Sequence, residues 1–161
     1  MALNVASLPI TVGVGAFLIR DGGLLVVRRT YGPAKGLWTI PSGYVEPRES
    51  VAQAVEREVR EETAVVARAE ALVGVRNRVS ATTNDTFLIF AMAYGSGEPR
   101  PDGEEVSEAA FLPLEDVSQS EDSAPFTRAI APKLAQARGM RLDAYAPSRD
   151  ASVTLAYLLY V

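Results

Sequence analysis

The sequence predicts a mixed α/β (α+β) domain, for three reasons: β-type segments predominate, two helical segments lie at separate places, and the length suits one hydrophobic core. The chain has 161 residues, which is an ordinary size for a single domain over residues 1–161. Hydrophobic residues make up 48% of the chain and charged residues 22%, a composition typical of globular proteins. Strands and helices are therefore expected to share one core.

Two strand candidates joined by a turn begin the chain. Thr11 to Ile19 and Leu24 to Arg29 are rich in β-branched and apolar residues, and Asp21-Gly22-Gly23 between them is a hairpin signal. Glycine and proline in Tyr31 to Gly36 predict a loop. A short strand is expected over Trp38 to Ile40, ended by the Pro-Ser-Gly sequence that follows it.

The strongest helix candidate is Ser50 to Thr63. Ser50 with Gln53 three residues later forms a capping-box pattern at its start. Valines recur at every fourth position from Val51 to Val59, which is the spacing of an apolar helix face. This segment is therefore predicted to pack one side on the sheet.

The second half alternates strand candidates with turns and ends in an extension. A second helix is predicted over Phe126 to Arg138, kinked or divided by Pro132. The extension, Met140 to Val161, has an uncertain role, and its last residues indicate a strand at a sheet edge or a subunit contact. The remaining strand candidates are Ala71 to Val79, Phe87 to Tyr94 and Val106 to Leu112.

Composition excludes several classes of function. The chain has no cysteine and no histidine, so disulfides, thiolate chemistry, histidine-ligated metals and imidazole triads are excluded. Its net charge of −4 disfavours non-specific nucleic-acid binding. The first nine residues lack the basic and apolar regions of a secretory signal, and Ala151 to Val161 is far too short to span a membrane. A cytoplasmic protein without nucleic-acid or membrane partners is expected.

Three acidic side chains of the first helix fall at the edge of its apolar stripe, at about 340°, 280° and 20° from Val51 when each residue turns the helix by 100°. They are Glu58, Glu61 and Glu62. Partial burial of neighbouring like charges raises their pKa values unless a cation lies among them. Because Arg57 and Arg60 are expected to point elsewhere, a hard divalent cation such as Mg²⁺ or Mn²⁺ is the predicted partner.

The helix alone also allows a simpler interpretation. Its charges would then form an ordinary solvated face with i,i+4 ion pairs, such as Glu56 with Arg60. Glutamate-rich helices are common, so the sequence on either side of the helix has to decide between the two interpretations.

From Gly43 the sequence reads GYVEPRESVAQAVEREVREETAV. Glu49 follows after five residues, Arg57-Glu58-Val59 after seven more, and Glu61-Glu62 after one more. This pattern resembles the Nudix box, G-x5-E-x7-R-E-U-x-E-E-x-G-U, where U is a bulky aliphatic residue. Ala64 replaces the last glycine, which suits left-handed backbone at a helix end, and alanine there costs roughly 1 kcal/mol. The likeness covers about residues 10–138 and implies a Nudix-type α/β/α sandwich with a central mixed β-sheet.

The resemblance also implies an activity. Nudix enzymes are Mg²⁺-dependent pyrophosphohydrolases that cleave the phosphoanhydride bond of a nucleoside diphosphate linked to another group, and ADP-ribose or a nucleotide sugar is the favoured substrate here. Two alternatives stay open: a nucleoside triphosphate pyrophosphohydrolase that removes damaged nucleotides, and a non-catalytic nucleotide-sensing module of the same fold. A small-molecule nucleotide is the expected partner, and a homodimer is an open expectation because family members often dimerise.

Individual roles follow from the matching positions. Glu105 is the first candidate for the base that activates water and Glu104 the second, although a box glutamate can serve instead. Glu49 is expected to support the site by contacting Arg57, which would orient a glutamate. The resemblance implies catalytic roles for Arg57, Glu58, Glu61 and Glu105, and metal ligation by Gly43, Glu58, Glu61 and Glu62.

Substrate contacts are less sharply indicated. Arg28 or Arg29, at a strand end near the box, is the best candidate for a phosphate contact, and Glu104 is an alternative substrate contact. Lys35, Arg76 and Arg78 are further cations, of which the last two alternate along one strand and so share a face. The candidates for stacking on a base are Phe17, Tyr31 and Phe87.

Overall fold

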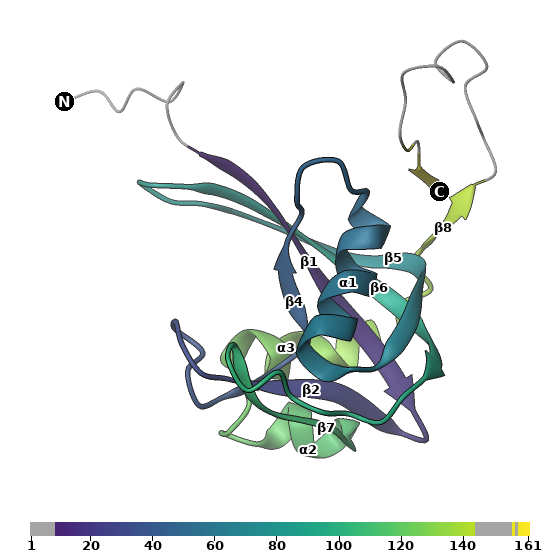
Figure 1. Ribbon diagram of the computed structural model, residues 1–161. Coiled ribbons are helices and arrows are strands. Elements are labelled where there is room, and N and C mark those ends of the chain that lie inside the picture. The colour runs from purple at the N-terminus through teal and green to yellow at the C-terminus, as the bar shows by residue number, and fades with distance from the viewer. Residues whose placement is uncertain (1–8, 144–155, 157) are drawn as a thin grey trace, which may run out of the picture.

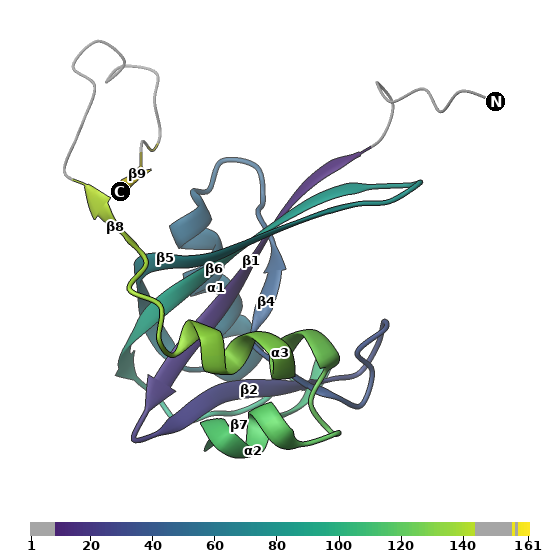
Figure 2. The same ribbon diagram turned by 180° about the vertical axis from the view of Figure 1, so that it is seen from behind.

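A computed structural model describes residues 9–143, 156 and 158–161. It has a central sheet with α1 on one face (Figure 1) and α2 and α3 on the other (Figure 2), which is the expected α/β/α sandwich. No helix in the described ranges is long and apolar enough to cross a membrane. The elements are β1 (Ile10–Arg20), β2 (Gly23–Arg29), β3 (Trp38–Thr39), β4 (Ser42–Tyr44), α1 (Val51–Thr63), β5 (Val66–Val79), β6 (Asn84–Ser96), β7 (Val106–Pro113), α2 (Leu114–Gln119), α3 (Pro125–Leu134), β8 (Met140–Asp143) and β9 (Leu159–Tyr160).

The sheet is mixed and has the order β3-β2-β1-β6-β5-β8-β9, with β4 also paired to β1 and β7 to β2. β1 and β6 run parallel, and the other pairs are antiparallel. Three register irregularities interrupt the pairing of β5 with β6, between Val66 and Ala67, Ala69 and Ala71, and Leu72 and Gly74. Because β1 pairs with both β4 and β6, it connects the strand that precedes α1 to the long β5–β6 ribbon.

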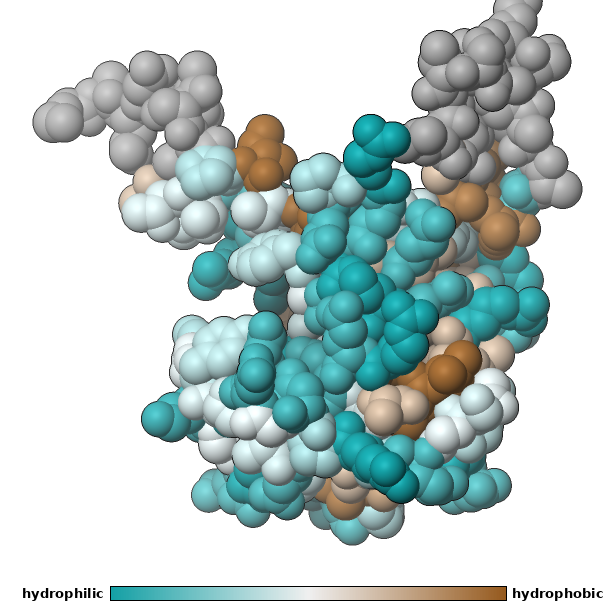
Figure 3. Space-filling model, in the orientation of Figure 1, coloured by the Kyte–Doolittle hydropathy of each residue, from teal (hydrophilic) through white to brown (hydrophobic). Residues whose placement is uncertain are grey.

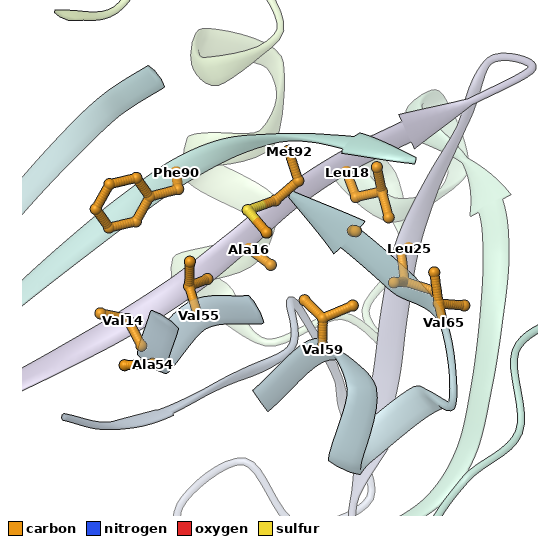
Figure 4. Packing of buried hydrophobic residues seen from close by; sticks show 11 residues of the cluster. Val14, Ala16, Leu18, Leu25, Ala54, Val55, Val59, Val65, Phe90 and Met92 are labelled. Carbon is orange, nitrogen blue, oxygen red and sulfur yellow. The ribbon is translucent and has the colours of Figure 1, made fainter. Parts of the chain in front are cut away.

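The sheet buries a different set of side chains on each face. On the α1 face, Val14 of β1 meets Val55 and Val59 of the helix and Phe90 of β6, and all four are fully buried (Figure 4). The opposite face packs a second cluster, which includes Phe17 and Trp38, under α2 and α3. Alternation along β1 sends successive side chains into these two layers.

Helix α1 begins and ends where the sequence predicts. The Ser50 hydroxyl accepts a hydrogen bond from Gln53 N at 3.2 Å, and Gln53 Oε1 accepts one from Ser50 N at 2.8 Å, so the capping box is complete. The helix ends at Ala64, whose φ of 59° and ψ of 4° are left-handed and whose N–H donates to Arg60 O. Alanine therefore occupies the backbone conformation that suits the glycine of the box.

Several expectations about the elements were wrong. The predicted stop after Ile40 contains a strand, β4, and the short helix α2 was not predicted. The second long helix ends at Leu134 rather than Arg138, and Pro132 lies in its last turn without dividing it. Of the predicted C-terminal strand, Leu159–Tyr160 pairs with β8 at the sheet edge, whereas 153–155 and 157 lie outside the described residues.

Candidate active site

Arg29 joins the three segments that meet at the end of α1. It forms an ion pair with Glu62, which is only 2% exposed. Its Nη2 also donates to Ser42 O and Ser42 Oγ, both at 2.9 Å, and Ser42 N donates to Glu62 Oε2 at 3.0 Å. A cation from β2 and an amide from β4 thus hold the buried carboxylate.

Arg57 lies among the carboxylates rather than pointing elsewhere, so that expectation was wrong. Its Nη1 donates to Glu58 Oε1 at 2.7 Å and to Glu61 Oε2 at 3.0 Å. Its Nε and Nη2 donate to the two oxygens of Glu49 at 3.1 and 2.8 Å, which is the expected Glu49 contact in bidentate form. Nη2 also donates to Tyr44 O. The guanidinium therefore ties the loop before α1 to the acidic edge of the helix.

Gly43 allows a very close approach between β4 and α1. A Cβ atom at this position would lie 2.1 Å from Glu58 Oε1 and 2.2 Å from Glu58 Cδ. No side chain can occupy that space while Glu58 keeps its position. The glycine of the box is thus explained by the carboxylate that lies against it.

Burial dominates the electrostatics of these glutamates. It raises the pKa of Glu58, against the opposing effect of Arg57 and with further upward contributions from Glu61 and Glu105. It raises the pKa of Glu62 to about 7, although Arg29 and the Ser42 amide oppose the change. Arg57 lowers the pKa of Glu49. The arginines and the Ser42 amide therefore offset only part of the cost of burying the charged forms of Glu58 and Glu62.

The described residues contain no group of three or more acidic side chains arranged to hold a metal ion. The reason is local: Arg57 engages Glu58 and Glu61, whereas Glu62 turns toward Arg29. The donor set still fits a hard divalent cation, since every ligand atom is an oxygen. Glu58 Oε2 and Glu61 Oε1 have no hydrogen-bond partner among the described contacts, which leaves a free oxygen on each.

Glu105, the first candidate for the base, lies on a separate loop. Asp102 Oδ1 accepts hydrogen bonds from the N–H groups of Glu104, Glu105 and Val106 at 2.9 to 3.0 Å. The Glu105 carboxylate accepts a hydrogen bond from the Tyr31 hydroxyl at 2.8 Å. The Glu105 carboxylate contributes to the raised pKa of Glu58, so it lies within electrostatic range of the box.

Two adjoining cavities, of about 380 and about 660 Å³, open next to the box loop. The space-filling view shows a recess between the β5–β6 ribbon and the loop after β2, beside the hydrophilic surface of α1 (Figure 3). Both cavities are lined by Arg29, Pro33, Ala34, Ser42, Tyr44, Arg76, Asp85 and Phe87. The hollow is large enough for a group of nucleotide size, and Arg29 and Ser42 connect it to Glu62 of the box.

Aromatic and charged groups form the wall of the larger cavity. The Arg76 guanidinium lies 5.0 Å from the Phe87 ring centre and 5.1 Å from that of Phe126, and it pairs with Asp85 at 2.5 Å. Arg76 Nε and Thr39 Oγ1 are buried without a hydrogen-bond partner in the described part of the chain. The wall thus combines flat aromatic surface with a guanidinium that is paired to Asp85.

The structure separates the sequence candidates for substrate contact. Arg28 does not line either cavity: it stacks on Trp38 at 4.6 Å, donates to Gly36 O and pairs with Glu108. Phe17 belongs to the core. The candidates that line a cavity are Arg29, Tyr31, Arg76, Arg78 and Phe87.

Sequence reasoning missed other lining residues, namely Thr39, Ser42, Tyr44, Asp85 and Phe126. One signal could have found Asp85, because Arg76 pairs in register with Phe87 and Arg78 with Asp85. Alternating charged and aromatic residues on two adjacent strands indicate a shared polar face. Phe126 comes from a distant helix, and no local pattern points to it.

Comparisons with known proteins agree with this geometry. The NUDIX domain model matches residues 9–134. An ADP-ribose pyrophosphatase from Methanocaldococcus jannaschii is 30% identical over 105 residues, which are 64% of this chain and 62% of that protein. This chain therefore spans less than two thirds of the length of that relative.

Solved structures show the same architecture. The MutT NUDIX hydrolase from Burkholderia pseudomallei aligns with a TM-score of 0.67 at 28% identity, over 77% of this chain and 97% of that chain. The NUDIX domain of NrtR from Shewanella oneidensis, solved in complex with ADP ribose, aligns with a TM-score of 0.61 at 25% identity, over 80% and 86% of the two chains.

Proposed function

The chain belongs to the Nudix family, and from this premise we propose that it hydrolyses a phosphoanhydride bond in a nucleoside diphosphate linked to another group. The observation that carries the proposal is that Arg29 and Ser42, which hold the box residue Glu62, also line a cavity of about 660 Å³ with an aromatic and cationic wall. ADP-ribose or a similar nucleotide sugar is the favoured substrate. The similarity to an ADP-ribose pyrophosphatase and to a domain solved with ADP ribose supports this choice.

Nudix hydrolases depend on divalent metal ions, and Mg²⁺ is the ion proposed here, with Mn²⁺ as the alternative. Gly43, through its carbonyl, and Glu58, Glu61 and Glu62 would hold it. When bound, such an ion supplies positive charge that offsets the charge developing on the phosphates. Glu49 and Arg57 keep the loop and the helix edge together, so that Glu58 and Glu61 stay side by side.

Glu105 is the proposed general base, with Glu104 or a box glutamate as the alternative. A base must lie within reach of the attacking water and be ionised when the reaction occurs. Glu105 is proposed because its Oε1 has no partner among the described contacts and because its carboxylate lies close enough to Glu58 to raise the pKa of that residue. The proton of the water would pass to this oxygen.

The larger cavity is proposed to hold the organic part of the substrate. Phe87 and Phe126 offer surface against which a flat base can stack. Arg76 and Thr39 also line this cavity, but Arg76 Nε and Thr39 Oγ1 are buried and would reach a substrate only if the side chains moved. Arg29 supplies positive charge where the cavity meets the box, which suits the phosphates.

One screen tests the proposal. Nucleotide sugars, dinucleoside polyphosphates, coenzymes and nucleoside triphosphates are each incubated with the protein and Mg²⁺, and the products are identified by mass. Glu62→Gln should abolish most turnover, while Glu70→Gln, an exposed change on β5, should leave it intact. Unchanged turnover in Glu62→Gln contradicts the metal assignment, and nucleotide binding without turnover identifies a sensing module.

The same screen decides between substrate classes. Preferential cleavage of nucleoside triphosphates would identify the alternative role in removing damaged nucleotides. The location in the cytoplasm, the homodimer and the absence of nucleic-acid partners stay predictions.

A further inference from the structure

The loop that carries Glu105 is fastened to the loop after β2. Thr30 N donates to Glu105 O at 3.0 Å, and Thr30 Oγ1 donates to Glu104 O and Glu105 O at 2.6 and 2.9 Å. On the other side, Asp102 Oδ1 accepts three backbone N–H groups from this loop. The backbone of Glu105 is therefore held from both sides although the segment is exposed.

A single contact fixes the side chain of Glu105. The Tyr31 hydroxyl donates to Glu105 Oε2 at 2.8 Å, and the described residues provide no other hydrogen bond or ion pair to this carboxylate. The bond raises the pKa of Tyr31, so the tyrosine stays protonated and remains a donor. Glu105 Oε1 is left free to face a water molecule.

Tyr31 also lines the smaller of the two adjoining cavities. It does so together with Gly32 and Ser42, next to Gly43 of the box. Tyr31 thus lines this cavity while its hydroxyl donates to Glu105. A single side chain therefore connects the place where substrate would bind to the group that would accept the proton.

We propose that Tyr31 is a positioning residue for Glu105, an inference that rests on the proposed function of Glu105 as general base. A free glutamate side chain samples many rotamers, and ordering it costs roughly 1 to 2 kcal/mol. The Tyr31 hydroxyl orders the Glu105 side chain before the substrate binds, because it holds Oε2 in place and leaves Oε1 free. Catalysis gains when the reacting groups are already oriented.

The test compares single and double variants on the substrate that the screen identifies. Tyr31→Phe keeps the ring and removes only the hydroxyl, so kcat should fall by about 10-fold, while KM should change less than about 2-fold. Glu105→Gln should lower kcat by about 100-fold or more, the typical contribution of a general base. In the Glu105→Gln background, Tyr31→Phe should have no further effect.

Tyr94→Phe is the matched control. Tyr94 donates its hydroxyl to Gly97 O at 2.9 Å on an exposed part of β6, so this variant loses a similar hydrogen bond outside the site. Its kcat and KM should equal those of the parent protein.

A second measurement does not depend on turnover. NMR titration of ring-labelled tyrosine should show the pKa of Tyr31 moving down toward its ordinary value in Glu105→Gln, because the negative acceptor is gone. An unchanged titration means that the hydrogen bond is not formed in solution and overturns the proposal.

The kinetic outcomes separate the two levels of inference. If Glu105→Gln lowers kcat and Tyr31→Phe does not, the positioning role is refuted while the base assignment stands. If Tyr31→Phe raises KM and leaves kcat intact, Tyr31 is a substrate contact instead. If Glu105→Gln has no effect, the base lies elsewhere and both assignments fall.

Discussion

Ala64→Gly should stabilise the protein, because alanine occupies a left-handed position at the end of α1. Its φ is 59° and its N–H closes the helix by donating to Arg60 O at 2.9 Å. The side chain is exposed, so removing its methyl group uncovers little apolar surface. The backbone conformation therefore decides the outcome.

The magnitude follows from two opposing effects. A left-handed conformation costs a non-glycine residue roughly 1 to 2 kcal/mol, which Ala64→Gly removes. Glycine makes the unfolded chain more flexible, which costs about 0.4 to 1 kcal/mol. The free energy of unfolding should therefore rise by about 0.5 to 1 kcal/mol, and the Tm by about 2 to 4 °C per kcal/mol for a chain of this size.

Thermal and urea unfolding measure the change, and Ala135→Gly is the control. Ala135 is the exposed cap residue at the end of α3, but its φ is −61°, where glycine brings no relief and costs about 0.5 to 1 kcal/mol. The two substitutions should move the free energy of unfolding in opposite directions. A loss of stability in Ala64→Gly, or an equal gain in both variants, would refute the reasoning.

Three further predictions concern the site and its supports. Gly43→Ala should lower kcat by about 10-fold or more by displacing the Glu58 carboxylate, while its Tm should stay close to that of the parent protein. Gly74→Ala, on β5, is the control. Full activity in Gly43→Ala would contradict the close approach of Gly43 to Glu58. In metal-free protein the pKa of Glu62 is raised to about 7, so the folded state favours the protonated carboxyl. The free energy of unfolding should therefore fall by up to about 3 kcal/mol between pH 4.5 and 8, as Glu62 loses its proton over that range. Urea unfolding in chelator at several pH values checks this, and a flat profile contradicts it. Ser50→Ala should cost about 1 kcal/mol by removing the helix cap, and a Tm equal to the parent's in a thermal melt contradicts it.

The sequence predicted the elements that local chemistry determines. The boundaries of α1 were correct because the capping box and the spaced valines are local signals. The strand β4 was missed because its three residues follow a proline, and they become a strand only by pairing with Gly13 to Gly15 of β1. The helix α2 was missed for a similar reason, since its first residue follows Pro113 and no side chain caps it.

The same distinction between local signals and tertiary contacts applies to the candidate site. The spacing of the glutamates could be predicted because they share one helix. The simpler alternative for that helix, an ion pair of Glu56 with Arg60, is not what the structure shows: Glu56 accepts a hydrogen bond from Ala69 N instead. The position of the Arg57 guanidinium was missed because the angle of a residue around the helix axis gives the direction of Cβ only. A long side chain can extend from there to neighbouring residues.

Contacts between distant segments could not be predicted at all. The ion pair of Arg29 with Glu62 joins residues 33 positions apart, and the bond from Tyr31 to Glu105 spans 74 positions. Such contacts depend on how the loops at one end of the sheet come together, and this is decided by tertiary packing rather than by local pattern.

The outer rim of β5 has a consequence for behaviour at high protein concentration. In the described part of the chain, only Ala71 and Leu72 of its outer rim pair with β8, and the ribbon beyond them exposes Val75 and Val79. A straight, flat rim of that kind is a template for adding further chains. The irregularities in the pairing of β5 with β6 all lie before Gly74, and Val75 to Val79 pair in unbroken register. The charged side chains of Arg76 and Arg78 within that stretch are therefore what should disfavour the addition of a further strand at this rim.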